Sequence, residues 1–183
     1  LPIYYVNAGT IEFLLESNEQ FYFMEMNTRI QVEHPVTECV TGIDLIKEQI
    51  RIAAGKKLSY RQQDVRIGGH AIECRINAEN PKEQFRPSPG LITDVYFPGG
   101  KGVRIDTAVY NGYEVPAYYD SMLAKLIVHA KTRKEAISKM RSALGEVIIE
   151  GVDTNVDYQY EIMNHPDYQA GNVDIEFISE KMC

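Results

Sequence analysis

The sequence contains little cysteine and no long apolar run. Its three cysteines, Cys39, Cys74 and Cys183, are widely spaced and form no C-x-x-C pair. A scattered, odd-numbered set of this kind argues against a disulfide framework or a zinc site, and we expect buried or terminal thiols in a reducing cytoplasm. No apolar run approaches the roughly 18 residues that a membrane-spanning helix needs. We therefore expect no membrane partner.

The sequence also lacks an excess of basic residues. Its formal net charge is −7, from 19 lysines and arginines against 26 aspartates and glutamates. Because the two signs are interleaved, there is no basic stripe to neutralise a phosphate backbone, and nucleic acid is not expected as a partner. The start, Leu1-Pro2-Ile3, has neither an initiator Met nor the residue order of a signal peptide, which favours a piece of a longer cytoplasmic chain.

The chain does contain a pattern of strands followed by helices, and its 183 residues are enough for one domain or one and a half. Capping pairs at Thr41 with Asp44 and at Thr154 with Asp157 predict the starts of two helices. Strands are expected over residues 11–15, 21–26, 70–77, 91–97, 102–109 and 123–130, and helices over residues 41–54, 132–145 and 154–165. The absence of a regular βαβ alternation predicts an α+β fold.

The residues that indicate chemistry lie between Phe21 and His34. In an extended chain successive side chains point to opposite faces, so one face of this segment is almost wholly apolar. The other face would carry Glu25, Asn27, Arg29, Gln31 and Glu33. The segment therefore predicts a strand with one functional face.

The expected hairpin register adds a second carboxylate to this face. With Asn18 and Glu19 at the tip of the turn, Glu12 lies directly opposite Glu25. Opposed side chains lie about 5 Å apart, where like charges repel unless a cation lies between them. Carboxylate and amide oxygens suit Mg²⁺ or Mn²⁺, so Glu12, Glu25 and Asn27 are a candidate metal cluster, which in turn indicates an ATP site. A solvent-facing polar hairpin is the alternative.

The next residues of the same face offer an anion site beside a base. Arg29 presents a planar fork for a small oxyanion, Gln31 adds a neutral donor, and Glu33 is a carboxylate that could take a proton from the anion. The alternative is an Arg–Glu pair on an exposed strand face, because such surface pairs are common and contribute little.

Several strings of the sequence resemble biotin carboxylases. The first reads Glu25-Met26-Asn27-Thr28-Arg29-Ile30-Gln31-Val32-Glu33-His34-Pro35-Val36-Thr37-Glu38 and is similar to the signature of that family. The others are His70-Ala71-Ile72-Glu73-Cys74-Arg75-Ile76-Asn77-Ala78-Glu79, Pro87-Ser88-Pro89-Gly90, Gly102-Val103-Arg104, Tyr118-Tyr119-Asp120-Ser121-Met122 and Thr154-Asn155-Val156. The resemblance covers nearly the whole chain and implies a C-terminal fragment of a biotin carboxylase. By it, residues 1–62 complete an ATP-grasp domain, and residues 63–183 form the C-terminal domain of mixed, mainly antiparallel sheet with helices.

The resemblance implies how ATP would be bound. Glu12, Glu25 and Asn27 match the positions that hold the Mg²⁺ or Mn²⁺ ions bridging the ATP phosphates. Leu14 and Met24 match positions that line the adenine pocket. The metal cluster inferred from the hairpin register is thus also the one that the resemblance implies.

The resemblance also implies roles in bicarbonate chemistry. Arg29, Gln31 and the backbone N–H of Val32 would bind bicarbonate, and Glu33 would be the base that deprotonates it. Arg104 would help to hold bicarbonate and would stabilise the biotin enolate. The implied mechanism is attack of deprotonated bicarbonate on the γ-phosphate of ATP, followed by breakdown of carboxyphosphate to CO₂ and phosphate beside biotin.

The resemblance further implies the setting of the reaction, the first half-reaction of acetyl-CoA carboxylase in fatty acid synthesis. The expected partners are a biotin carboxyl carrier protein, carboxyltransferase subunits and a second copy of the chain in a homodimer. The alternatives are the same module of a propionyl-CoA, methylcrotonyl-CoA or pyruvate carboxylase, or a non-catalytic dimerisation module. The family's glycine-rich lid and phosphate-binding lysines have no counterpart here, so we expect this polypeptide alone not to turn over.

Overall fold

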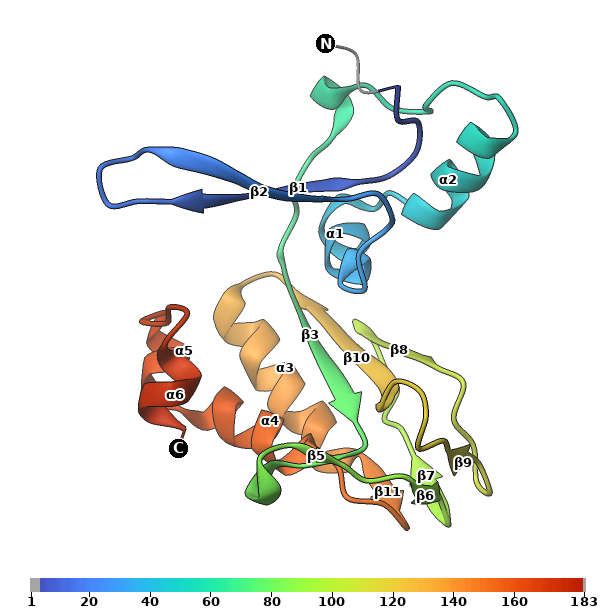
Figure 1. Ribbon diagram of the computed structural model, residues 1–183, viewed down its shortest axis with the longest axis vertical. Helices are drawn as coiled ribbons and strands as arrows, with labels where there is room; N and C mark the ends of the chain where they lie inside the picture. Colours follow the sequence, from blue (N-terminus) through green and yellow to red (C-terminus); the bar gives the residue numbers. More distant parts are fainter. Residues whose placement is uncertain (1–3, 183) are drawn as a thin grey trace. The chain divides into compact units, whose positions relative to one another are not determined.

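The computed structural model describes residues 4–182, and the chain divides into two compact units (Figure 1). The first unit ends at Gly68 and the second begins at Gly69. The domain boundary expected after residue 62 lies close to this division and stays a prediction. The expectations for Leu1-Pro2-Ile3 and for Cys183 lie outside the described residues.

The first unit begins with an antiparallel hairpin of β1 (Thr10–Leu15) and β2 (Phe21–Asn27). Hydrogen bonds from Glu16 N to Gln20 O (2.8 Å) and from Glu19 N to Glu16 O (3.0 Å) close its turn. Glu19 has a φ of 66°, and a left-handed residue is typical at the end of a three-residue hairpin loop. The predicted hairpin is confirmed.

Two helices follow, α1 (His34–Thr41) and α2 (Leu45–Ala53), where the sequence predicts a single helix. Gly42 ends α1 in the left-handed conformation with a φ of 71°. The carboxylate of Asp44 caps α2 by accepting a hydrogen bond from a backbone N–H in its first turn. The predicted helix start at Thr41 is therefore wrong, because Thr41 is the last residue of α1. A 3₁₀ turn at Gln62–Asp64 follows α2.

The second unit is built on a three-stranded antiparallel sheet in the order β3-β10-β8. The strands are β3 (His70–Asn77), β8 (Val103–Thr107) and β10 (Met122–Ala130). Two helices, α3 (Arg133–Glu146) and α4 (Val156–Asn164), pack against this sheet (Figure 1). The predicted α+β class is confirmed.

The main core of this unit lies between the sheet and its helices. Alternate residues of the strands point into it, and α3 adds an apolar stripe at helical spacing. Its members include Ile76, Leu126, Val128, Met140 and Leu144, each at most 2% exposed. Cys74 lies in the same core, where burial, with a smaller effect of the Glu73 charge, raises the pKa of its thiol to about 12. The expected buried thiol is thus confirmed at Cys74, whereas Cys39 is half-buried.

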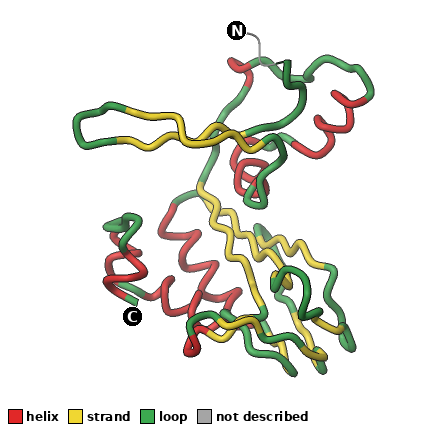
Figure 2. Tube along the Cα trace, viewed as in Figure 1, coloured by secondary structure: helices red, strands yellow, loops and turns green. Residues whose placement is uncertain are grey.

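Short two-stranded ladders extend the second unit beyond the sheet (Figure 2). They pair β4 (Glu79–Asn80) with β5 (Arg86–Pro87), β6 (Gly90–Leu91) with β9 (Glu114–Val115), and β7 (Asp94–Tyr96) with β11 (Ile148–Glu150). The single strand predicted over residues 91–97 is therefore divided between β6 and β7, which pair with different strands. A 3₁₀ turn at Pro81–Glu83 follows β4. Two short helices, α5 (Pro166–Ala170) and α6 (Phe177–Lys181), follow α4.

The start of α4 also differs from the prediction. The sequence predicts that Thr154 and Asp157 cap this helix, whereas the residue at the N-cap position is Asn155. The Asn155 side chain makes no capping hydrogen bond and instead contacts the backbone of β3. The predicted helix end at His165 is confirmed. Over residues 4–182, no helix is both long and apolar enough to cross a membrane.

Candidate functional site

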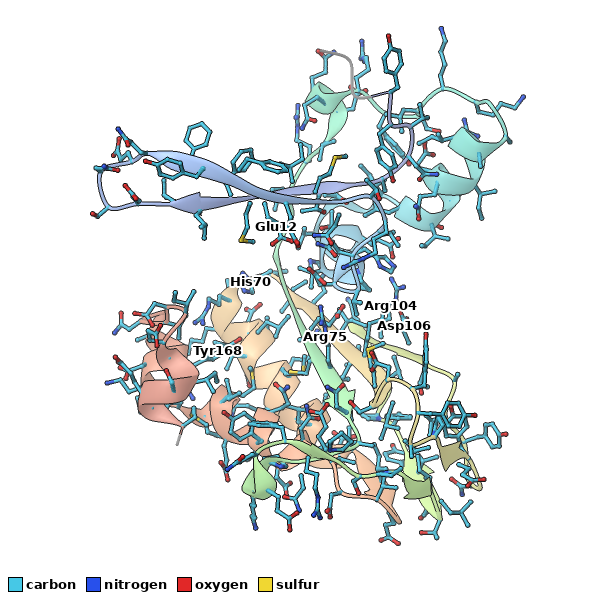
Figure 3. The ribbon with its side chains drawn as sticks, viewed as in Figure 1. Glu12, His70, Arg75, Arg104, Asp106 and Tyr168 are labelled. Carbon is cyan, nitrogen blue, oxygen red and sulfur yellow. The ribbon has the colours of Figure 1, made fainter. Side chains whose placement is uncertain are left out.

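Glu12 and Glu25 face each other on the hairpin, as the sequence predicts. They are directly opposed residues of β1 and β2, and Glu12 is labelled in Figure 3. The Nδ2 of Asn27 donates to Glu12 Oε1 at 2.8 Å and to Glu25 Oε1 at 3.0 Å. Both carboxylates thus converge on one nitrogen, which relieves part of their repulsion. The three residues predicted as metal ligands lie in one cluster.

Nearer the turn, the register departs from the prediction. Beyond Glu12 the pairing shifts by one residue, so Leu14 lies opposite Tyr22 and Met24 is the extra residue of a β-bulge. A regular register along the whole hairpin is therefore wrong. Leu14 and Met24, the two residues expected to line an adenine pocket, are 59% and 47% exposed on the hairpin.

Arg29 and Gln31 extend the hydrogen-bonded network from Asn27. Arg29 donates from Nη2 to Asn27 Oδ1 at 3.2 Å and from Nη1 to the carbonyl oxygen of Ile30 at 3.1 Å, and it also donates to Gln31 Oε1. The extended strand predicted as far as Glu33 is wrong, because β2 ends at Asn27 and the chain then turns into α1. The side chains of Asn27, Arg29 and Gln31 nevertheless remain in contact.

Val32 and Glu33 lie in the turn that leads into α1. Glu33 is the N-cap residue of that helix, and it is exposed. His34 holds the same turn from the helix side, because its Nδ1 lies 2.8 Å from the carbonyl oxygen of Gln31. The predicted bicarbonate residues of this unit therefore occupy one short loop.

The cluster of Glu12, Glu25 and Asn27 fits a small divalent cation. The cluster offers two carboxylates and one amide. It is smaller than a group of three or more His, Cys, Asp or Glu side chains, and residues 4–182 contain no such group that could hold a metal. Hard oxygen ligands suit Mg²⁺ or Mn²⁺, and a small ligand set leaves coordination positions for phosphate and water. The Asn27 amide would have to turn over to offer its carbonyl oxygen, because its nitrogen faces both carboxylates.

Arg104 lies in the second unit, on the face of the sheet opposite the main core. Arg104 and Asp106 are on β8, and Lys125 on β10 lies directly opposite Asp106. Asp106 accepts hydrogen bonds from Arg104 Nε at 2.7 Å and from Arg104 Nη2 at 2.9 Å, and Lys125 Nζ lies 3.4 Å from its carboxylate. Partial burial by itself would raise the pKa of Asp106, but the hydrogen bonds and charges of Arg104 and Lys125 outweigh it and lower the pKa.

Arg75 is a further cation on this face, for which the residue pattern alone indicates no role. It lies on β3 directly opposite Lys125, and it is exposed. Figure 3 labels Arg75, Arg104 and Asp106 in the second unit. The alternation of apolar and polar residues along β3 could have placed Arg75 on this face, because every second side chain of a strand points away from the core.

The two units match two known sequence families. Residues 73–180, more than half of the chain, match the biotin carboxylase C-terminal domain. The chain belongs to the biotin carboxylase family. Residues 2–61 match the ATP-binding domain of the carbamoyl-phosphate synthase L chain. The expected order, part of an ATP-binding domain before a biotin carboxylase C-terminal domain, is the order of these matches.

The chain is similar to members of this family along almost its whole length. It is 58% identical to the biotin carboxylase of Allochromatium vinosum, over 97% of this chain and 39% of the relative. It is 56% identical to a pyruvate carboxylase subunit of Methanothermobacter thermautotrophicus, over 96% of this chain and 36% of the relative. A solved structure, the biotin carboxylase domain dimer of the Hydrogenobacter thermophilus 2-oxoglutarate carboxylase in complex with MgADP, ADP and bicarbonate, matches with a TM-score of 0.92 and 50% identity, over 95% of this chain and 38% of that chain.

These matches confirm the family and the fold that the sequence predicts. The chain spans about two fifths of the length of these relatives, 39% and 36%. The relatives belong to different carboxylases at nearly equal identity, 58% and 56%.

Proposed function

We propose that this chain is the part of a biotin carboxylase that holds the divalent metal and bicarbonate, and that the whole enzyme uses ATP to carboxylate biotin on a carrier protein. The observation that carries the proposal is the hydrogen-bonded network that runs from Glu12 and Glu25 through Asn27 and Arg29 to Gln31. This network joins a candidate cation site to a candidate anion site. A reaction between an ATP phosphate and a small oxyanion requires these two sites side by side.

Glu12, Glu25 and Asn27 would hold Mg²⁺ or Mn²⁺ against the ATP phosphates. The bound cation would neutralise negative charge on the phosphate oxygens. The Hydrogenobacter thermophilus domain was solved with MgADP, which supports ATP and Mg²⁺ as the nucleotide and metal of this family member. Leu14 and Met24 would line the adenine pocket with their exposed apolar side chains.

Arg29, Gln31 and the backbone N–H of Val32 would bind bicarbonate, and Glu33 would accept its proton. Gln31 accepts a hydrogen bond from Arg29, so its amide must turn over before it can donate to the anion. The deprotonated oxygen of bicarbonate attacks the γ-phosphorus of ATP, the bond to ADP breaks, and carboxyphosphate forms. Carboxyphosphate breaks down to CO₂ and phosphate, and this phosphate takes the ureido proton as the biotin nitrogen attacks CO₂.

A cation on the polar face of the second unit would stabilise the biotin enolate, because positive charge placed in advance stabilises a developing oxyanion. The family resemblance assigns this role, and a part in holding bicarbonate, to Arg104. Asp106 already holds the Arg104 guanidinium at two points. Arg75 is exposed on the same face of the sheet, directly opposite Lys125 of β10, and is the second candidate. Biotin-dependent turnover of Arg104→Ala and of Arg75→Ala, measured separately, distinguishes the two candidates, because the variant that lacks the enolate-stabilising cation should lose more turnover.

The biotin carboxyl carrier protein and the carboxyltransferase subunits would be the partners of the whole enzyme. A homodimer is supported by the dimer of the Hydrogenobacter thermophilus domain. Acetyl-CoA carboxylase and fatty acid synthesis are the proposed setting, and a propionyl-CoA, methylcrotonyl-CoA or pyruvate carboxylase is the alternative. A non-catalytic dimerisation module would differ from all of these, since Mg-ATP would not raise its melting temperature.

Biotin-dependent ATP hydrolysis by the full-length parent protein, with bicarbonate and Mg²⁺, tests the proposal. Glu33→Gln and Arg29→Ala should each lower turnover by about 100-fold or more, because one removes the base and the other removes the oxyanion fork. Glu19→Gln and Arg66→Ala change exposed residues outside the network and should leave turnover near normal. Near-normal turnover of the first two variants, with folding intact, would make Glu33 and Arg29 ordinary surface residues and contradict the mechanism.

A further inference from the structure

Asn155 joins the start of α4 to the backbone of β3. Its Oδ1 accepts a hydrogen bond from Asn77 N at 2.9 Å, and its Nδ2 donates to the carbonyl oxygen of Arg75 at 3.1 Å. The backbone N–H of Asn155 donates to the carbonyl oxygen of Asn77 at 3.2 Å. Asn155 is only 5% exposed, so water cannot readily replace these bonds, and an unpaired partner would be costly.

These bonds matter because β3 is an edge strand of its sheet. In the order β3-β10-β8, only one side of β3 pairs with another strand of the sheet. An edge strand presents backbone N–H and C=O groups that need other partners. Asn155 supplies the donors and the acceptor that a neighbouring strand would supply between Arg75 and Asn77. It thereby helps to fix the direction in which the Arg75 side chain leaves the strand.

Other contacts hold the same end of β3. Asn77 Nδ2 donates to Glu79 Oε1 at 3.3 Å, and Ser121 Oγ donates to the same oxygen at 2.5 Å. The N–H of Ala78 donates to the carbonyl oxygen of Ser121 at 2.8 Å. The strand end that carries Arg75 is therefore held from the β10 side as well as from α4.

We infer that Asn155 is a positioning residue, which holds Arg75 in the orientation that the biotin enolate requires. The inference rests on the role proposed for Arg75. Asn155 would not touch the substrate and would act only through the backbone of β3. A misplacement of about 1 Å can lower a rate by about 100-fold. Loss of the Asn155 bonds should therefore lower kcat, while ATP binding at the hairpin of the first unit is unaffected.

The test measures kcat, the KM for MgATP and the melting temperature of the full-length parent protein. Asn155→Asp keeps the size of the side chain and its acceptor but removes the donor to the Arg75 carbonyl oxygen. We expect kcat for biotin-dependent ATP hydrolysis to fall about tenfold or more, with the KM for MgATP unchanged. Asn164→Asp is the matched control, because Asn164 Nδ2 donates to Tyr160 O at 2.8 Å within α4. It should lower the melting temperature without lowering kcat.

A double variant separates positioning from simple stabilisation. If Asn155 acts through Arg75, then Arg75→Ala and Arg75→Ala with Asn155→Asp have the same kcat. Additive losses, or a lower melting temperature of Asn155→Asp with kcat unchanged, would overturn the inference. Near-normal turnover of Arg75→Ala alone would overturn the role of Arg75, and the inference with it. Asn155→Gln keeps both polar groups one methylene further out, and it replaces Asn155→Asp in the same comparison if that variant does not fold.

Discussion

At Asn27 a single amide nitrogen lies between two carboxylates, since Glu12 and Glu25 both accept hydrogen bonds from its Nδ2. An aspartate here would remove the shared donor and add a third negative charge. We predict that Asn27→Asp lowers the melting temperature of the metal-free protein at neutral pH. Mg²⁺ or Mn²⁺ should restore it, because a cation bound to the folded state stabilises that state by mass action.

Thermal unfolding with and without metal measures this effect. Asn18→Asp in the hairpin turn is the matched control, because Asn18 uses Oδ1 to accept from Gln20 N at 3.0 Å, and an aspartate keeps that acceptor. Asn18→Asp should change the melting temperature little in either condition. Equal behaviour of Asn27→Asp and Asn18→Asp would show that the two carboxylates do not form a cation site.

Asp106 should make stability depend on pH in acid. Arg104 and Lys125 lower its pKa in the folded state, so the unfolded state, with an ordinary pKa of about 3.9, takes up the proton first. The stabilisation by the ionised carboxylate is therefore complete above that value and is lost as the pH falls through the folded-state pKa. Because the ion pairs are partly exposed, we expect a contribution of only about 1 kcal/mol.

The prediction compares wild type with Asp106→Asn by urea unfolding over a pH series. The free energy of unfolding of the wild type should exceed that of Asp106→Asn near pH 6. The difference should shrink between about pH 5 and pH 2, the range in which an aspartate of lowered pKa becomes protonated. A difference that stays constant over that range would show that Asp106 is not stabilised as an ion.

At the scale of secondary-structure elements, the hairpin shows what local sequence determines. Two strand runs around a short turn predict the hairpin, but Glu12 lies opposite Glu25 only because the bulge at Met24 offsets a turn that is one residue longer than expected. The bulge at Met24 could not be predicted, because a one-residue shift leaves the local preference for strand unchanged. The continuation of the strand to Glu33 is wrong for a related reason, since alternating residues do not reveal where pairing stops.

The missed features of the helices depend on short segments and distant partners. α1 has only eight residues, with proline in its first turn, so its apolar pattern is too short to identify a helix. Asn155 forms hydrogen bonds with Asn77 and Arg75, which lie 78 and 80 positions before it in the sequence. A local capping pattern cannot show such distant contacts. The pattern therefore predicts Thr154 as the N-cap residue of α4, whereas Asn155 occupies that position.

Gly151 follows β11 directly, beside the ladder that β11 forms with β7. Its φ is 99°, and a Cβ there would lie 2.1 Å from the carbonyl oxygen of Leu91 and 3.1 Å from Thr93 N. An alanine would combine backbone strain with a clash against backbone atoms. We predict that Gly151→Ala lowers the free energy of unfolding by about 3 kcal/mol.

Gly112 provides the matched control for this prediction. Its φ is 88°, but no heavy atom lies within 4 Å of a Cβ built there. Gly112→Ala should therefore cost only the backbone strain, about 1 kcal/mol. Both variants can be measured by urea unfolding, and equal losses would rule out the predicted clash at Gly151.

At the scale of the whole molecule, each compact unit carries residues with a proposed role, the metal cluster in the first unit and Arg75 and Arg104 in the second. The hairpin that carries the metal cluster also exposes large apolar side chains, with Phe13, Phe21 and Phe23 between 49% and 68% exposed. A two-stranded hairpin of this kind needs further packing to be stable. The chain spans only 39% of the Allochromatium vinosum relative, so the predicted changes in activity refer to the full-length protein.

Mn²⁺ binding to that parent protein in the presence of ADP, followed by the electron paramagnetic resonance signal of free Mn²⁺, tests the metal assignment most directly. Glu12→Gln and Glu25→Gln should each weaken binding by about tenfold or more, because each removes a charged ligand. Glu16→Gln, at the exposed turn of the same hairpin, should leave binding unchanged. Unaltered Mn²⁺ affinity in both Glu12→Gln and Glu25→Gln would contradict the metal site and the function built on it.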